Sequence, residues 1–265
     1  MIEALQFDFM QHALIAAILA SYICGIMGAL IVVNRIVFLS GGIAHAAYGG
    51  IGLSVFMGWP FLIGTIGFSV VSAIIMAGIS LNNKERSDAI IGVIWAFGMA
   101  FGIILVDLTP GYQVDLMSYL FGSILTVPKT DLIIMGVVAA ILTFFVTLYY
   151  FELLAISYDD EFARVRGLPV KKLYFSMIIM LAITIVLVIR VVGLILIIAL
   201  LTIPAYIMEK FARSLFQMII GSILLACIFS ISGLFLSYQF NIATGASIIL
   251  VASVFFGISH FIRTN

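Results

Sequence analysis

The chain contains about nine apolar runs of roughly 20 residues, and short stretches with charged or turn residues separate them. A helix of about 20 residues matches the thickness of a bilayer's hydrocarbon core, where its backbone groups bond to one another. The sequence therefore predicts an all-α fold, a polytopic transmembrane helical bundle of about nine spans. The expected spans are residues 13–33, 41–59, 61–81, 89–106, 132–151, 173–189, 191–208, 215–236 and 243–262.

The low charge content excludes a soluble fold of this size. Only 9% of the 265 residues are charged and 65% are hydrophobic, whereas roughly 25% charge is usual in soluble domains. Lipid must then cover the surface that polar side chains cover in a soluble protein. The formal net charge is +0 at pH 7, so we expect no binding of nucleic acid. Because the spans fill the chain, residues 1–265 are expected to form a single transmembrane domain.

The basic residues predict the orientation of the spans. With alternating loops, ten of the twelve Lys and Arg residues fall on one side, and only Lys129 and Arg190 fall on the other. Cytoplasmic loops are the ones enriched in Lys and Arg. We therefore expect the N-terminus outside and the C-terminus in the cytoplasm. Two of the turns are expected to be very short, at Trp59–Pro60 and at Arg190.

The acidic residues all fall in loops or at the ends of spans. Carriers driven by protons or sodium commonly bind the coupling ion at buried carboxylates or broken helices. The lack of acidic residues in the middle of the predicted spans therefore argues against such a carrier. The chain also lacks the common nucleotide-binding and hydrolase motifs, so we expect no enzymatic activity and an energy source in another subunit. The acidic residues are Glu3, Asp8, Glu85, Asp88, Asp107, Asp115, Asp131, Glu152, Asp159, Asp160, Glu161 and Glu209.

The longest cytoplasmic loop, residues 152–172, has the start and stop signals of a short helix. Asp159 is suited to cap its first turn, Gly167 to end it in the left-handed conformation, and Pro169 to prevent its continuation. Acidic residues come first and basic residues last, which complements the helix dipole. The loop therefore predicts a helix of about two turns.

Such a helix is too short to be stable alone. Phe162 and Val165 are three residues apart and share one face. We interpret this face as a knob that docks into a groove of a cytoplasmic partner. The alternative is a solvated loop that rests on the membrane surface.

The second span opens with a glycine-rich segment that contains a histidine. His45 shares a helical face with Gly41 and Gly49, one turn to either side, and Tyr48 follows three residues later. Residues without side chains leave space in front of the imidazole, as expected beside a transport pathway. Small residues at four-residue spacing also predict close approach of another helix. Ionisable groups within membranes are usually functional, but a neutral histidine that bonds to a neighbouring helix is the alternative.

Five segments resemble one family over nearly the whole chain: the membrane permease subunit of ATP-binding-cassette importers for zinc, manganese or iron. The resemblance implies a single transmembrane permease domain in the cell (inner or plasma) membrane of a prokaryote. The matching segments are Ser40 to Gly50, Tyr119 to Ser123, Asp160 to Leu173, Val192 to Ala205, and Thr244 to Leu250.

The resemblance also implies partners and residue roles. The expected partners are cytoplasmic ATPase subunits, an extracellular metal-binding protein and a second copy of the chain. The substrate pathway is expected at His45, Gly41, Tyr48 and Gly49, with His45 as a metal ligand. The coupling helix for the ATPase is expected at Asp160, Glu161, Phe162, Ala163, Arg164, Val165, Gly167 and Leu168.

One position departs from the family pattern. The family usually has an Asp four residues before the histidine of the second span, and this chain has Gly41 there. We expect a divalent metal ion as the transported substrate and no permanently bound cofactor. The alternatives are an ATP-driven permease for a vitamin or iron chelate, for which Gly41 leaves room, and a secondary carrier that uses no ATP.

Overall fold

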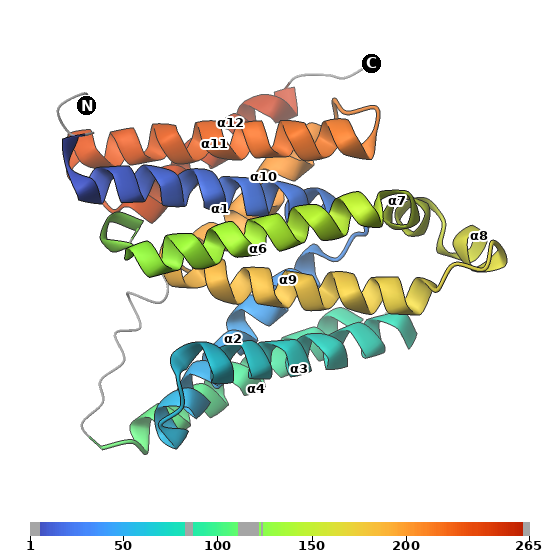
Figure 1. Cartoon of the computed structure of the whole chain (residues 1–265), viewed down its shortest axis with the longest axis horizontal. Helices are drawn as coiled ribbons and strands as arrows, with labels where there is room; N and C mark the ends of the chain where they lie inside the picture. The colour runs from blue at the N-terminus through green and yellow to red at the C-terminus, as the bar shows by residue number, and fades with distance from the viewer. Residues whose placement is uncertain (1–5, 83–86, 111–121, 123, 262–265) are drawn as a thin grey trace. The chain divides into compact units, whose positions relative to one another are not determined.

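The computed structural model describes residues 6–82, 87–110, 122 and 124–261, and the elements within these ranges are helices (Figure 1). They are α1 (Asp8–Val33), α2 (Val37–Met57), α3 (Phe61–Asn82), α4 (Ser87–Asp107), the 3₁₀ helix η3 (Ile124–Thr126), α6 (Lys129–Leu148), α7 (Tyr150–Tyr158), α8 (Asp160–Val165), α9 (Val170–Val192), α10 (Leu194–Glu209), α11 (Leu215–Phe240) and α12 (Thr244–Phe261).

Each of the nine predicted spans corresponds to a helix of the structure. Seven helices in the described ranges are long and apolar enough to cross a membrane: α1, α3, α4, α6, α9, α11 and α12. The other two are α2, whose 21 residues include several glycines and His45, and α10, which has 16 residues. The predicted helical membrane bundle is confirmed, and the count of nine spans is approximate.

The break between α9 and α10 lies at Gly193, not at Arg190 as the sequence analysis expected. Gly193 has a φ of 85°, a conformation that side chains with a Cβ disfavour. Gly122, with a φ of 65°, packs so closely that a Cβ on it would collide with the amide nitrogen of Gly193. Arg190 stays in α9, and its Nε lies 3.2 Å from a carboxylate oxygen of Asp131.

The expected fifth span, residues 132–151, ends earlier than predicted. α6 stops at Leu148, Tyr149 has a non-helical φ of −107° with ψ of 23°, and α7 begins at Tyr150. The Tyr150 hydroxyl accepts a hydrogen bond of 3.1 Å from the backbone N–H of Phe216. This bond satisfies one of the amides that a helix leaves free in its first turn. Because α7 and α8 both fall largely within residues 152–172, much of the expected cytoplasmic loop is helical.

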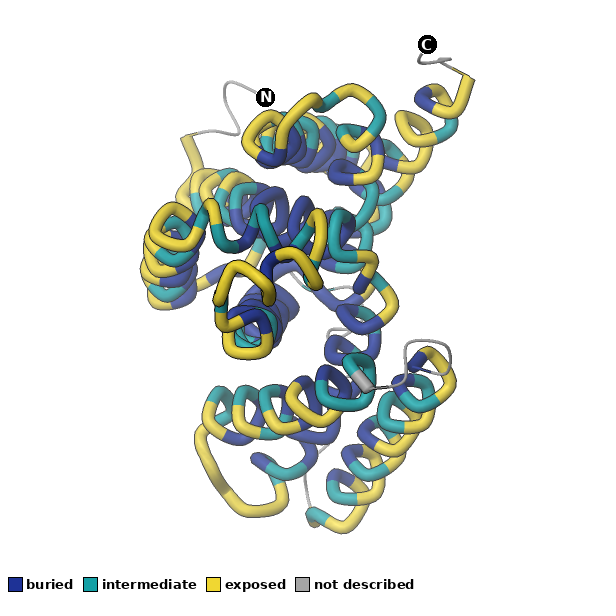
Figure 2. Tube along the Cα trace, turned by 90° about the vertical axis from the view of Figure 1, so that its right-hand side faces the viewer, coloured by how far each residue is buried: buried dark blue, intermediate teal, exposed yellow. Residues whose placement is uncertain are grey.

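The described chain divides into two compact units. The first holds α1, η3, α6, α7, the end of α9, α10, α11 and α12, and the second holds α2, α3, α4, α8 and the rest of α9. Within each unit, buried residues line the sides of helices that face a neighbour, and exposed residues follow the outer sides (Figure 2). Many of those exposed residues are large and apolar, as expected for helices that face lipid.

α1 is the central helix of the first unit. It packs along α11 and also contacts α10, α6 and η3 (Figure 1). A Cβ on Gly25 would lie 2.7 Å from the Cα of Ile223, so the two backbones meet without a side chain between them. The hydroxyls of Ser21 and Ser230, both buried, are hydrogen-bonded across this contact at 2.9 Å. Small residues and a buried hydrogen bond are the usual means of joining helices in lipid.

Polar contacts in the first unit join helix ends that the predicted topology places on the same side. Asn34, after α1, donates a 2.9 Å hydrogen bond to Ser157 in α7. Lys210, after α10, donates a 3.2 Å bond to the carbonyl of Ser259 near the end of α12. The Asp131–Arg190 ion pair likewise joins the start of α6 to the end of α9. These contacts confirm the alternation of these helices, while the absolute orientation stays a prediction.

The acidic residues that the structure describes lie in terminal turns of the long helices or in the short segments around α7 and α8, as predicted. Asp8, Asp88 and Asp131 fall in first turns, and Asp107 and Glu209 end their helices. Some of the residues named above, and three of the ten Lys and Arg residues counted on the cytoplasmic side, lie outside the described ranges. They are Glu3, Lys84, Glu85, Arg86, Asp115, Tyr119, Leu120, Phe121, Ser123 and Arg263.

α2 is the central helix of the second unit and packs on α3 and α4. A Cβ on Gly50 would lie 2.6 Å from the Cα of Thr65 in α3. A Cβ on Gly52 would collide with the backbone of Gly102 in α4. The predicted close approach at the small residues of α2 is therefore confirmed, and it occurs on two sides of the helix.

Replacing Gly102 by alanine should destabilise the second unit, because the new Cβ would collide with the carbonyl oxygen of Tyr48 in α2. Overpacking of this kind costs about 1–3 kcal/mol. The matched control is Gly92→Ala in the same helix, where nothing lies within 4 Å of the added Cβ. Thermal unfolding in detergent should show a lower midpoint for Gly102→Ala only. Equal midpoints for the two variants would contradict the close packing of α2 on α4.

Candidate functional site

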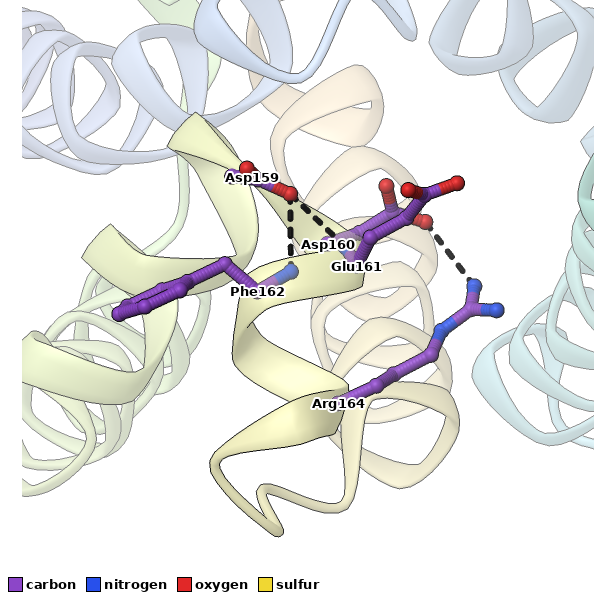
Figure 3. Close-up of polar contacts among 5 residues, drawn as sticks. All are labelled: Asp159, Asp160, Glu161, Phe162 and Arg164. Atoms are coloured by element: carbon purple, nitrogen blue, oxygen red, sulfur yellow. Dashed lines mark hydrogen bonds and ion pairs between the residues drawn. The ribbon is translucent and has the colours of Figure 1, made fainter.

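The short helix predicted within residues 152–172 is present as α8, and Asp159 caps it (Figure 3). The Asp159 carboxylate accepts hydrogen bonds from the backbone N–H groups of Glu161 at 3.0 Å and Phe162 at 2.9 Å. Asp160 pairs with Arg164 one turn later, at 2.9 Å. Such exposed pairs are worth only a few tenths of a kcal/mol. The cap, which satisfies two free amides, therefore contributes more to the order of the first turn.

The end of α8 is also built as the sequence predicts. Gly167 has a φ of 81°, and its N–H donates to the carbonyl of Arg164 at 2.9 Å. The N–H of Leu168 donates to the carbonyl of Ala163 at 3.1 Å. These two bonds form a Schellman motif, in which a left-handed glycine lets the last carbonyls find donors. The prediction of a short helix is confirmed, and its docking on a partner rather than resting on the membrane surface stays a prediction.

α8 exposes its two large apolar side chains. Phe162 is 54% exposed and Val165 is 87% exposed, whereas Ala163 between them is fully buried. The guanidinium of Arg166 lies 5.5 Å from the centre of the Phe162 ring, on its face. An exposed aromatic residue beside an exposed valine is a small apolar patch that a partner could cover.

His45 occupies the second candidate site, on α2 in the second unit. Its ring stacks on the indole of Trp95 from α4, with centroids 4.0 Å apart and planes 15° apart. Its Nδ1 is buried, and no described residue forms a hydrogen bond with it. The ring therefore contacts the neighbouring helix by stacking, and both the pathway role and the structural role of His45 stay predictions.

The space beside His45 lies on one side only. A Cβ on Gly41 would have nothing within 4 Å, so this side is open, as the sequence analysis expected. At Gly49 the expectation of space is wrong, because an added Cβ would lie 2.7 Å from the ring of Phe68. Tyr48 is 4% exposed, so it belongs to the packed part of α2.

Two more buried polar atoms of the second unit lack a hydrogen-bond partner among the described residues. They are the hydroxyls of Ser69 in α3 and Thr184 in α9, both in fully buried residues. Buried polar groups are nearly always paired, and an unpaired one indicates strain, water or an ion. The described residues contain no group of three or more His, Cys, Asp or Glu that could hold a metal ion. A cation in this unit would need other ligands as well.

Sequence reasoning did not identify Trp95 as a neighbour of His45. Both residues were placed in predicted spans, but they lie in different helices, and helical spacing relates only residues of the same helix. Their contact depends on how α2 packs against α4. A tryptophan inside a predicted span is a weak signal, because apolar spans accept aromatic residues at many positions.

The chain is similar to membrane transport proteins over nearly its whole length. A model of the ABC 3 transport family matches residues 6–263. The "Uncharacterized membrane protein slr2045" of Synechocystis sp. is 49% identical over 259 residues, 98% of this chain and 92% of the relative. The "Manganese import system permease protein ScaB" of Streptococcus gordonii is 35% identical over 256 residues, 97% of this chain and 92% of the relative.

A solved structure with a similar fold is "PsaBC from Streptococcus pneumoniae in complex with Fab". Its matching chain has a TM-score of 0.88 and 37% identity, and the match covers 99% of this chain and 95% of that chain. The likeness therefore extends over the helices of both compact units.

Replacing Asp159 by alanine should loosen α8, because the amides of Glu161 and Phe162 lose their acceptor. The loss of an N-cap costs about 1 kcal/mol, so exchange of α8 amides should be roughly fivefold faster. Hydrogen–deuterium exchange of peptides covering α8 measures this. Asp159→Asn keeps a capping oxygen and should exchange nearly as the parent does. Unchanged exchange in the alanine variant would show that the cap does not hold α8.

Proposed function

We propose that this chain, which belongs to the ABC 3 transport family, is the membrane permease subunit of an ATP-driven importer of a divalent metal ion. The observation that carries the proposal is α8, an ordered cytoplasmic-loop helix with its apolar side chains exposed. The printed name of the Streptococcus gordonii relative, a manganese import system permease protein, supports the cargo class. Zinc, manganese and iron remain the candidate ions.

α8 would dock on a cytoplasmic ATPase subunit and transmit its motion to the spans. Phe162 and Val165 would enter an apolar groove of that subunit, since leaving both in water forfeits about 1.5–3 kcal/mol for each side chain. The helix is capped at both ends, so it can dock without first having to order. The proposed coupling segment comprises Asp160, Glu161, Phe162, Ala163, Arg164, Val165, Gly167 and Leu168, in which Ala163 is buried and supports the helix from within.

We assign ATP hydrolysis to that separate subunit and the translocation pathway to this chain. Support comes from the acidic residues, since those within the described ranges lie in terminal turns of the long helices or near α7 and α8. A proton- or sodium-driven carrier commonly needs ionisable or broken-helix sites at mid-membrane depth. The secondary carrier is therefore the less supported alternative.

The proposed assembly has two copies of the chain, each acting as one permease domain, and two ATPases. An extracellular metal-binding protein would deliver the ion. The chain would lie in the plasma membrane of a prokaryote, with its N-terminus outside and its C-terminus in the cytoplasm, as the distribution of Lys and Arg favours.

The proposed pathway passes His45 on its open side at Gly41, whereas Tyr48 and Gly49 lie in the packed part of the same helix. A delivered ion needs only brief binding within the membrane, so a small ligand set is sufficient. A second candidate cargo is a metal chelate, because the open space at Gly41 would accept a larger group.

Co-expression with its ATPase and reconstitution into proteoliposomes with the capture protein test the proposal directly. We expect ATP hydrolysis that rises when a divalent metal ion is added, because binding-protein delivery and hydrolysis are coupled. The measurement is phosphate release against metal concentration. Failure of the chain to associate with any ATPase would overturn the proposed function. Stimulation by a metal chelate but by no free metal ion would favour the second candidate cargo.

Replacing both Phe162 and Val165 by aspartate should uncouple the permease from the ATPase. The double change removes two apolar contacts worth together about 3 kcal/mol or more, which corresponds to at least about hundredfold weaker docking. Metal uptake and co-purification of the ATPase measure the loss. The matched control, Phe162→Leu with Val165→Ile, keeps both side chains apolar and should retain most of the uptake. Full uptake in the aspartate variant would show that α8 is not the docking knob.

A further inference from the structure

A groove on the surface of the first unit lies between α6 and α11. Both of these helices pack on α1 (Figure 1), and Tyr22 and Ile26 of α1 lie in the groove between them. The groove consists of two adjoining hollows of about 620 Å³ and about 440 Å³, which share Tyr22, Thr143 and Thr147. Both hollows are open at the surface, so a molecule from the surrounding membrane can enter them.

The groove has about the length of one leaflet of a bilayer. It follows residues 18–26 of α1 and 139–147 of α6, and at 1.5 Å per residue each stretch measures about 12 Å. Tyr150 and Phe151 of α7 extend it further, whereas half of a hydrocarbon core is about 15 Å thick. The groove ends where α7 and α11 begin, on the side that the Lys and Arg residues place in the cytoplasm. It therefore runs from the middle of the membrane to its cytoplasmic surface.

The walls of the groove are suited to a hydrocarbon chain. Their hydroxyl groups are already bonded to the protein: Tyr22 bonds to Thr143 at 2.8 Å, and Thr147 donates to the carbonyl of Thr143 at 2.8 Å. Apart from Tyr150 at the end, the other lining residues are alanine, valine, leucine, isoleucine and phenylalanine. An apolar chain gains dispersion contacts in such a groove that it lacks among mobile lipid chains.

The cytoplasmic end of the groove has donors suited to a phosphate group. The Tyr150 hydroxyl accepts a 3.1 Å hydrogen bond from the N–H of Phe216, which leaves its own hydrogen to donate. Arg213 is exposed just before α11, and its N–H donates to the Gln217 side chain at 3.0 Å. A guanidinium can bind phosphate through two parallel hydrogen bonds. Glu152 of α7 is two residues from Tyr150, so the two side chains do not share a face.

We propose that this groove binds one phospholipid of the cytoplasmic leaflet, with an acyl chain over α1 and the phosphate at Tyr150 and Arg213. The apolar walls hold the chain, and the donors at the membrane surface fix the depth of the headgroup. Such a lipid site is independent of the transported ion and of the ATPase.

The dimensions of the groove favour a lipid chain over a helix from a second copy of the protein. Hollows of about 440 Å³ and about 620 Å³, each about 12 Å long, have mean cross-sections of roughly 35–50 Å². A helix with its side chains is 10–12 Å across and needs about 80 Å² or more. A helix would therefore rest on the rim of the groove, whereas a single acyl chain can lie inside it.

Native mass spectrometry of the full chain tests the site. The protein is stripped of lipid in detergent and titrated with palmitoyl-oleoyl phosphatidylglycerol, and we expect each chain to retain one phospholipid. Ile220→Trp fills the groove from α11 and should lower the retained fraction at least about fivefold, because the acyl chain loses its contacts. The matched control is Ile228→Trp on the same helix. Ile228 is 47% exposed against 42% for Ile220, but it lines neither hollow, so this variant should retain lipid as the parent does.

The same titration tests the phosphate contact. Arg213→Gln should lower phospholipid retention severalfold, because it removes the charged donor. Lys172→Gln, which changes an exposed basic residue in the first turn of α9, is the control and should have no effect. Palmitoyl-oleoyl glycerol has the same acyl chains without the phosphate. It should bind the parent more weakly than the phospholipid does, and Arg213→Gln should not change its binding.

Thr147→Trp fills the groove from the opposite wall, so the test does not depend on the folding of one variant. Lipid retention that is unchanged in a folded groove-filling variant would overturn the site. Equal binding of the phospholipid and of palmitoyl-oleoyl glycerol would overturn the phosphate contact. If the parent retains no lipid and Ile220→Trp instead weakens association between copies, the groove is an interface between copies and the proposal is wrong.

Discussion

The structure depends on one constraint: backbone amides and carbonyls within a bilayer must bond to one another, because no water is available. Long helices satisfy this requirement internally, and the described chain has helices wherever the sequence is continuously apolar. Irregular backbone is placed where it is protected. At the junction of α9 and α10, Gly193 with its positive φ lies directly against Gly122.

The second constraint is how closely these helices approach one another. Lipid is as apolar as the helix surfaces, so association depends on contact between closely packed backbones. α2 meets α3 and α4 at glycines, where an added Cβ would collide with the opposing helix. The same close packing brings the rings of His45 and Trp95 into a stack. In this unit the packing of the fold and the surroundings of His45 are therefore a single feature.

α8 is stabilised by hydrogen bonds at its two ends, because it packs little against other helices. The long helices α1, α2, α6 and α10 begin without a side-chain cap, since their apolar surroundings hold them. α8 has six residues and relies on Asp159 at one end and the Gly167 turn at the other. These local hydrogen bonds allow it to keep Phe162 and Val165 exposed.

The sequence by itself determined the features that depend on residues close together in the chain. The apolar runs predicted the helices, and Asp159 and Gly167 predicted both ends of α8, because these signals act within a few residues. Local signals did not reveal that α9 continues past Arg190, since the charge that looked like a boundary is paired with Asp131 from α6. Only the tertiary structure decided that pairing, the loss of space at Gly49, and the contact of His45 with Trp95. Each is set by which helices pack side by side and at what distance, and periodicity within a single helix carries no information about either.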